Sequence, residues 1–266
     1  MERRRRVQES SLNPEREADP IRISGIFTDL HHHVVYGVDD GAQTFEEAQK
    51  MLRLAHQQGI RCIVCTSHAR PGLEPFPMQR YWEHLQEERH WLREEGIGME
   101  LLEGCEILWD PSAVRKLDVG EIPTINQTRY VLVEFFPTDP VARLEEAARS
   151  LSMAGYSPIF AHVERFRALR RRGVLKRLRD SYGVLCQMNA NTVIAAAGRG
   201  LFRDRWPQQV LEQDMIDLVA TDAHNVAERR CRMQEAAQAL SGLVGADQAR
   251  HLCIDWPQDI CEGRLV

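Results

Sequence analysis

The sequence predicts an α/β fold, a distorted TIM-like (β/α)7 barrel. Short apolar runs alternate with amphipathic stretches along most of the chain, and this alternation is typical of a parallel sheet covered by helices. The 266 residues are 43% hydrophobic, which suits one large core. No linker-like segment separates a second domain, so residues 23–266 are expected to fold as one unit.

The first β/α unit is predicted from a short strand and a capped helix. Residues 26–30 are mostly apolar and form the strand. Thr44 and Glu47 have the spacing of a capping box, which marks a helix N-terminus. Gly59 ends this helix, and before it apolar residues recur at helical spacing: Ala48, Met51, Leu52 and Ala55.

Six further strands are predicted from short apolar runs. In chain order they cover residues 61–66, 100–106, 130–135, 157–162, 184–189 and 217–222. Charged amphipathic stretches predict helices between or after them, over residues 79–95, 140–154, 168–181 and 227–241. Gly155 is the stop signal of the second of these helices.

Residues 1–22 are predicted to be a disordered tail. They mix both signs of charge with Ser, Asn, Gln and Pro, and show no apolar periodicity. The basic residues Arg3 to Arg6 are not followed by an apolar stretch, so this segment is not a secretory signal. No apolar run approaches the roughly 20 residues of a membrane helix, so no membrane span is expected.

Charge and cysteine content narrow the class of protein further. The formal net charge of −5 argues against general affinity for nucleic acid. The seven cysteines are an odd number scattered over a long chain. This usage favours reduced thiols and a cytoplasmic location.

Histidine and acidic residues gather where the predicted strands end. Six of the seven predicted strands are followed by such a residue, whereas chance placement would scatter them. The C-terminal ends of the strands form the catalytic rim of a β/α barrel. We therefore predict a metal site at this rim, with nine candidate ligands: His31, His33, Asp40, His68, Glu106, Glu134, His162, Asp222 and His224.

The ligand types indicate which ions this site would take. Nine ligands are too many for one tetrahedral zinc and suit two or three divalent ions with bridging carboxylates. Nitrogen and oxygen ligands without thiolates favour Mn, Fe or Zn over soft metals. With three divalent ions on four carboxylates the site is net positive, so it would attract a phosphate group despite the acidic protein. Such ions activate water as a nucleophile.

Two arginines lie close to candidate ligands in the sequence. Arg165 follows His162 by three residues, and Arg229 follows His224 by five. Each guanidinium is expected to bind phosphate oxygens, the alternative being a surface ion pair. The basic stretch 165–179 is read as a solvated helix face, or as a surface that steers acidic or phosphorylated substrates toward the rim.

A cysteine mechanism is not favoured. Cys62 and Cys65 form a C-x-x-C pattern, but they lie inside a predicted strand, where core cysteines are expected. The spacing from Cys65 to Arg70 is one residue short of the phosphate-binding loop of cysteine phosphatases.

These motifs resemble the polymerase and histidinol phosphatase (PHP) superfamily, over roughly residues 27–240. The Asp-Asp-Gly turn and the His-x-Glu-Arg motif are similar to its bacterial branch of manganese-dependent protein-tyrosine phosphatases, the CpsB/YwqE type linked to capsule and exopolysaccharide synthesis. The stretches that carry the resemblance are Asp29-Leu30-His31-His32-His33, Val38-Asp39-Asp40-Gly41-Ala42, Thr66-Ser67-His68, Gly104-Cys105-Glu106-Ile107, Leu132-Val133-Glu134-Phe135, Ile159-Phe160-Ala161-His162-Val163-Glu164-Arg165-Phe166 and Thr221-Asp222-Ala223-His224-Asn225.

The resemblance implies three metal sites and two phosphate-binding arginines. Arg165 and Arg229 match the family's phosphate-contacting arginines. His32 stands where a small residue is usual and should point away from the metals. The loop 70–78 has no family residues to map. The implied ligand sets are His31, His33, Glu106 and Asp222 for the first ion, Glu106, Glu134 and His162 for the second, and Asp40, His68 and His224 for the third.

The expected function is that of a phosphoric monoester hydrolase acting on phosphotyrosine by metal-activated hydroxide, without a covalent phosphoenzyme. The expected cofactor is Mn²⁺, with Fe or Zn as alternatives. The expected partner is a phosphotyrosine-bearing protein such as a bacterial tyrosine kinase of exopolysaccharide regulation, and a homo-oligomer is left open. Two alternatives remain: a small-molecule phosphatase (histidinol-phosphatase-like) or phosphodiesterase, and a metal-bound regulatory module with little turnover.

Overall fold

A computed structural model describes residues 26–198 and 204–266. The predicted disordered tail at residues 1–22 lies outside the described residues. All strand pairs of the described residues are parallel, in two sheets with the orders β1-β2-β4 and β3-β5-β6-β7-β8-β9. Their bounds are β1 Phe27–His32, β2 Ile60–Cys65, β3 His68–Ala69, β4 Glu100–Glu103, β5 Glu106–Leu108, β6 Tyr130–Glu134, β7 Ser157–Phe160, β8 Leu185–Asn189 and β9 Leu218–Ala220.

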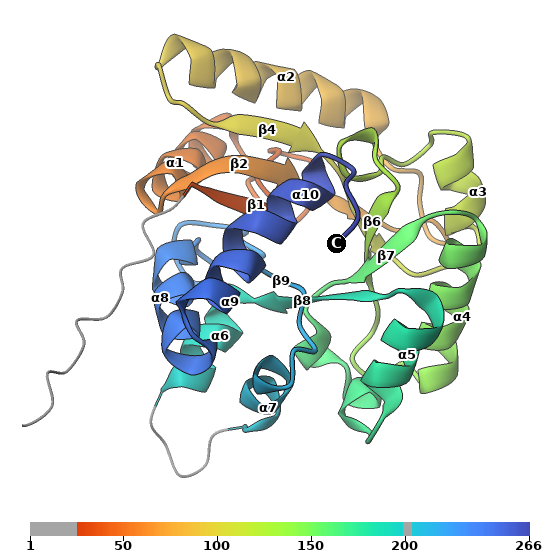
Figure 1. The fold of residues 1–266 in the computed structure, drawn as a ribbon. Helices are drawn as coiled ribbons and strands as arrows, with labels where there is room; N and C mark the ends of the chain where they lie inside the picture. The colour runs from red at the N-terminus through yellow and green to blue at the C-terminus, as the bar shows by residue number, and fades with distance from the viewer. Residues whose placement is uncertain (1–25, 199–203) are drawn as a thin grey trace, which may run out of the picture.

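The two sheets form one distorted barrel (Figure 1). Two residues separate β2 from β3, and two separate β4 from β5, so the strands occupy seven positions around the ring. The last position meets the first through a parallel bridge between His32 and Ala223. His33 donates its backbone N–H to the Ala223 carbonyl at 2.9 Å, and Asp222 donates to the His31 carbonyl at 2.8 Å. The predicted α/β barrel with seven strand positions is confirmed.

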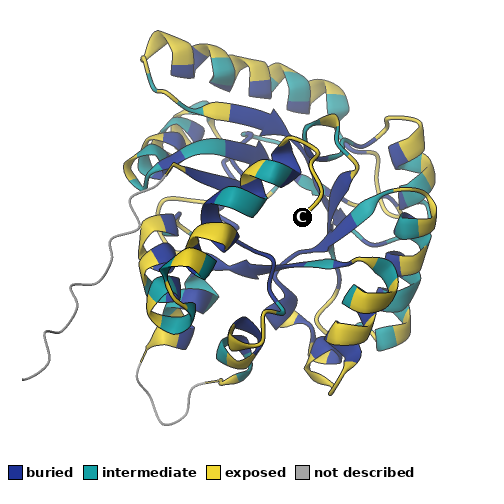
Figure 2. Cartoon of the chain, viewed as in Figure 1, coloured by how far each residue is buried: buried dark blue, intermediate teal, exposed yellow. Residues whose placement is uncertain are grey.

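The strands and the helix faces turned toward them are buried (Figure 2), and most of the buried residues are apolar. The interior cluster includes Leu30, Leu132 and Ile159, all fully buried. Helix α10 (Trp256–Cys261) closes the N-terminal end of the barrel, because Ile260 and Cys261 join this cluster. Buried polar residues, among them His31, Glu106 and Asp222, lie at the opposite end, where the strands terminate.

Helices surround the strands in the predicted order. Helix α1 matches its prediction: Glu47 donates its backbone N–H to the Thr44 hydroxyl oxygen at 3.3 Å, and the four predicted apolar residues are buried. None of the described helices combines the length and the apolarity that crossing a bilayer requires. The principal helices are α1 Phe45–Gln57, α2 Met78–Glu94, α4 Val141–Met153, α5 Val174–Tyr182, α6 Ala190–Ala197 and α8 Met233–Val244.

Two predicted helices begin later than expected. The helix predicted over 168–181 starts at Val174, because Gly173 has a φ of 76° and separates it from a 3-10 turn at Arg167–Arg170. The helix predicted over 227–241 starts at Met233. The structure also contains short helices that are not predicted from the sequence: α3 Ala113–Asp118, α6, α7 Trp206–Glu212, α9 Ala246–Arg250 and α10.

Candidate metal centre

A β-bulge directs His31 of β1 into the barrel. Between Asp29 and His32, β1 advances three residues while its partner β2 advances two. An extra residue in one strand reverses the alternation of its side chains. As a result Leu30 packs in the barrel interior, and His31 also faces inward, with its Nδ1 3.2 Å from the Gln187 Oε1 of β8.

Four side chains from three parts of the chain converge beside this bulge. The Nε2 atoms of His31 and His33 lie 3.1 Å apart. Glu106 Oε2 lies 3.2 Å from His31 Nε2 and 3.3 Å from His33 Nε2. Asp222 Oδ1 lies 3.4 Å from the first nitrogen and 3.6 Å from the second. Two ligands that each lie about 2.1 Å from one ion are about 3.0–3.4 Å apart, so this spacing fits a shared cation.

A second group adjoins the first through Glu106. The Nδ1 atom of His68 lies 3.1 Å from both Glu106 Oε2 and Glu134 Oε1 without forming a hydrogen bond to either. His162 Nε2 lies 2.7 Å from Glu106 Oε1 and 3.8 Å from Glu134 Oε2. Glu106 Oε2 therefore faces His31, His33 and His68, and Oε1 faces His162. A carboxylate that bridged two ions would have this arrangement.

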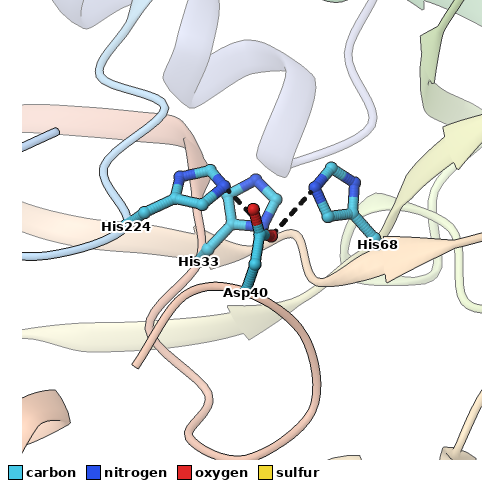
Figure 3. Close-up of side chains that lie close together, drawn as sticks. All are labelled: His33, Asp40, His68 and His224. Atoms are coloured by element: carbon cyan, nitrogen blue, oxygen red, sulfur yellow. Dashed lines mark ion pairs between the residues drawn. The ribbon is translucent and has the colours of Figure 1, made fainter. Parts of the chain in front are cut away.

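A third group surrounds Asp40, on the loop after β1 (Figure 3). Asp40 Oδ1 lies 3.2 Å from His68 Nε2 and 3.5 Å from His224 Nε2. His33 stacks on His224 with ring centroids 3.8 Å apart. The structure thus brings all nine predicted ligands into one cluster, with His68 between the second and third groups.

Hydrogen bonds to the outer ring nitrogens fix three of these imidazoles. Asp39 Oδ2 lies 2.7 Å from His33 Nδ1, and Gln187 Oε1 lies 3.2 Å from His31 Nδ1. His224 Nδ1 lies 3.0 Å from the backbone carbonyl of Asp222. An imidazole that donates from Nδ1 presents the lone pair of Nε2, the usual arrangement around a bound metal. In each case Nε2 is the atom that faces the cluster.

The imidazoles and carboxylates of the cluster shift one another's pKa values. Burial opposes ionisation of Glu106, but His31 and the other imidazoles around it hold the pKa of its carboxyl well below the ordinary value. Burial likewise disfavours charge on His33, yet Asp39 and then Glu106 raise the pKa of this ring to about 9. Positive charge inside the cluster therefore stabilises the carboxylates, and a divalent cation would supply it without protons.

Two predicted ligands have left-handed backbone conformations. His162 has a φ of 31° and Asp222 a φ of 53°. Such values cost energy for residues other than glycine and gather at functional sites. Each residue lies two positions after the end of its strand, so the strain accompanies the turn that directs its side chain into the cluster.

Strand β8 contributes two residues to the site that the sequence does not predict, because it is the one predicted strand without a histidine or acid. Gln187 accepts hydrogen bonds from the His162 backbone N–H at 2.7 Å and donates to Asn189 Oδ1 at 2.8 Å. Asn189 in turn donates to Asp222 Oδ2 at 2.9 Å. Two amides spaced two residues apart in an otherwise apolar buried strand were the available signal.

The two predicted arginines reach the same carboxylate. Arg165 Nη2 lies 2.6 Å from Asp222 Oδ2, and Arg229 Nη2 lies 2.9 Å from Asp222 Oδ1. Their side chains are 41% and 38% exposed, so both guanidiniums border the open side of the cluster. A tight turn holds Arg229 there, because Asn225 Oδ1 accepts its backbone N–H at 3.0 Å.

The remaining candidates take no part in this cluster. Cys65 is fully buried in β2, and burial raises the pKa of its thiol well above the ordinary value. His32 is buried without a hydrogen bond to either ring nitrogen, and it belongs to none of the ligand groups. Burial lowers the pKa of His32 to about 3, so its ring is neutral.

Comparison with a protein-family model gives an extended match. Residues 27–262 match the family described as capsular polysaccharide synthesis, CpsB/CapC. This span contains all nine candidate ligands and both arginines.

Named relatives and a solved structure agree with this match. The chain is 31% identical to the tyrosine-protein phosphatase CpsB of Streptococcus pneumoniae over 90% of this chain and 99% of that protein. It is 31% identical to the tyrosine-protein phosphatase YwqE of Bacillus subtilis over 82% of this chain and 85% of that one. A solved structure from work on YwqE and CpsB, described as unique metal-dependent tyrosine phosphatases, superposes with a TM-score of 0.80 at 28% identity, over 90% and 96% of the two chains.

Proposed function

Because the chain belongs to the CpsB/CapC family, we propose that it is a metal-dependent protein-tyrosine phosphatase of the capsule and exopolysaccharide system. The observation that carries the proposal is the convergence of nine nitrogen and oxygen ligands beside two arginines at the rim of the barrel. The relatives named above are tyrosine-protein phosphatases, and their likeness extends over nearly the whole chain.

The donor set fits two or three divalent ions. We assign one ion to His31, His33, Glu106 and Asp222, a second to Glu106, Glu134 and His162, and a third to Asp40, His68 and His224. Two buried nitrogens support this fit. His224 Nε2 faces Asp40 of the third set without a hydrogen-bond partner. His68 Nδ1, also without one, faces Glu134 of the second set, so this ring borders both ions. Nitrogen and oxygen ligands without thiolates are compatible with Mn²⁺, which we propose as the resident ion, with Fe or Zn as alternatives.

Residues of the chain are proposed to bind the phosphoryl group and to keep the ligands in position. When bound, the ions supply a deprotonated water as nucleophile at neutral pH and withdraw charge from the phosphoryl group. Each of Arg165 and Arg229 is proposed to give up part of its hydrogen bonding to Asp222 when substrate binds. Their guanidiniums then hold the phosphoryl oxygens that face the open rim. Guanidinium donors there stabilise charge that grows in the transition state. Asn189 retains its hydrogen bond to Asp222 and keeps that carboxylate in position.

The proposed partner follows from the family description, and the proposed location follows from the state of the cysteines. We propose that the substrate is a bacterial tyrosine kinase that regulates capsule or exopolysaccharide synthesis, following the family description. All seven cysteines are unpaired and six are buried, which supports the reducing cytoplasm as the place of action. A homo-oligomer stays a prediction from the family resemblance, and light scattering on the purified protein tests it.

A substrate panel tests the proposed function. The metal-loaded protein is assayed with a phosphotyrosine peptide, histidinol phosphate and bis-nitrophenyl phosphate, each with added Mn²⁺. We expect the phosphotyrosine peptide to give the highest kcat/KM. Preference for histidinol phosphate or the diester would favour the alternative enzymes, and no turnover of any compound by metal-loaded protein would favour a regulatory module.

A further inference from the structure

An arginine-rich segment extends from the metal cluster across the catalytic rim. Residues 165–172, here called the rim loop, lie between β7 and α5 and follow the candidate ligand His162. Loops between a strand and its following helix lie on the catalytic face of a β/α barrel. The rim loop contains five arginines, and the first of them, Arg165, reaches the cluster through Asp222.

Three of these arginines lack a charge partner. Arg167, Arg171 and Arg172 are exposed, and no acidic side chain of the described residues lies within ion-pair distance of any of them. Arg170 differs, because it pairs with Asp204 at 2.7 Å. The nearest acid in sequence, Glu164, is buried and accepts hydrogen bonds from the β8–α6 region. The exposed face of the rim loop therefore carries uncompensated positive charge on a protein whose net charge is −5.

An exposed aromatic side chain lies beside this charge. Phe136 follows the candidate ligand Glu134 by two residues and is 54% exposed. Its loop is joined to the rim loop, because Arg167 donates its backbone N–H to the Pro137 carbonyl at 3.1 Å. A single exposed phenylalanine is ordinary. Here, however, its neighbour Pro137 is hydrogen-bonded to Arg167 and it follows a candidate ligand by two residues, so it lies close to both the unpaired arginines and the ligand cluster.

We propose that Phe136 and the rim-loop arginines Arg167, Arg171 and Arg172 form a docking surface for an acidic peptide segment that flanks the phosphotyrosine. This inference rests on the proposed function, since it names the class of substrate that the same site prefers. Carboxylates of the segment pair with guanidiniums, which are weakly hydrated and bind carboxylates in a fixed geometry. The charge also draws an acidic chain toward the rim before contact, an effect that salt screens. Phe136 contributes apolar contact to the same segment.

The test compares two phosphotyrosine peptides that differ only in their flanks, one with Glu and Asp and the other with Gln and Asn. Wild-type enzyme is expected to give a kcat/KM about tenfold higher for the acidic peptide at low ionic strength, and this preference should shrink with added salt. A double variant, R167E/R171E, should abolish the preference while hydrolysis of p-nitrophenyl phosphate stays within about twofold. Phe136→Ala should raise KM for both peptides with little change in kcat.

A matched control makes the same change of charge elsewhere. Arg93 and Arg149 are exposed near the C-terminal ends of α2 and α4, at the opposite face of the barrel. R93E/R149E should keep the preference for the acidic peptide. Equal hydrolysis of both peptides by wild-type enzyme, or equal loss in both double variants, would overturn the docking surface.

The docking surface and the proposed function fail in different ways. If no phosphotyrosine peptide is cleaved, the proposed function is wrong, and fluorescence anisotropy of the two peptides still decides whether the surface binds acidic chains. If the double variant instead loses binding to anionic phosphatidylserine vesicles while wild-type enzyme does not distinguish the peptides, the surface contacts lipid and the proposal is overturned.

Discussion

The Nε2 atoms of His31 and His33 face each other at 3.1 Å inside a fully buried part of the barrel. Each ring is held by an outer hydrogen bond that directs this nitrogen toward its neighbour. Two lone pairs at this distance repel each other unless a proton or a cation lies between them. The carboxylates of Glu106 and Asp222 complete the arrangement within 3.6 Å, which is the basis for assigning a divalent ion here.

Removing either arginine should slow the chemical step. Arg165→Ala and Arg229→Ala are each expected to lower kcat by about 10²–10³, because a donor to developing negative charge acts mainly in the transition state. Metal content, measured by mass spectrometry of the purified variants, should stay normal. Arg171→Ala, in the rim loop, should change KM and its salt dependence at most. Normal turnover by both active-site variants would show that the phosphate roles are assigned wrongly.

Removing the carboxylate that accepts a hydrogen bond from His33 should weaken metal binding. Asp39 accepts hydrogen bonds from His33 Nδ1 and from the backbone N–H groups of Gly41 and His68. Outer partners of this kind typically change metal affinity about 10–100-fold, so Asp39→Asn should need that much more Mn²⁺ for half-maximal activity. The exposed Glu46→Gln serves as the control. Unchanged metal titration of Asp39→Asn would mean that its carboxylate does not orient a ligand.

Metal binding should release protons. Although burial opposes charge on His68, Asp40 and Glu134 raise its pKa to about 11, and Asp39 raises that of His33 to about 9. Before metal binds, both rings are therefore cationic at neutral pH, with a proton on each nitrogen, and coordination requires the neutral ring with one nitrogen deprotonated. Affinity should rise with pH between about 6 and 9. Calorimetry in buffers of different ionisation enthalpy measures the protons, and binding without proton release would contradict this account.

The thiol next to the site should be dispensable. Cys65→Ser is expected to keep kcat within about threefold of wild type, because the buried thiol in β2 is held in its neutral form and cannot serve as a nucleophile. Thermal unfolding of the variant provides the control for folding. Loss of activity in a variant that unfolds at the wild-type temperature would point to a cysteine mechanism.

The gathering of the candidate ligands at one rim of the barrel could be predicted from the sequence, because these residues follow the ends of the strands. In a parallel barrel all strand ends meet at one rim, so His68, Glu134 and His162 had to approach one another whatever the loops do. The bulge in β1 escaped prediction because a spacing of two residues, as between His31 and His33, looks the same in a regular and a bulged strand. Single-turn elements such as the 3-10 turn at 167–170 also leave little periodic signal.

Outer-sphere contacts were the least predictable part. The sequence predicts a strand that contains Gln187 and Asn189 but no role for either residue, because amides have no fixed preference for metals and their partners are distant in sequence. The sequence predicts Arg229 near the rim, where it contacts Asp222, but within a helix. The structure holds it in a turn, where Asn225 Oδ1 accepts its backbone N–H and His224 donates to its carbonyl at 2.9 Å.

Metal content and its link to turnover test the central claim most directly. Purified wild-type protein should contain two or three divalent transition ions per chain. Exhaustive chelation should abolish hydrolysis of a phosphotyrosine peptide, and added Mn²⁺ should restore it. His31→Ala should lose both ion and activity, whereas His90→Ala, on the surface of α2, should lose neither. Full activity of the chelated, metal-free wild-type protein would contradict the account.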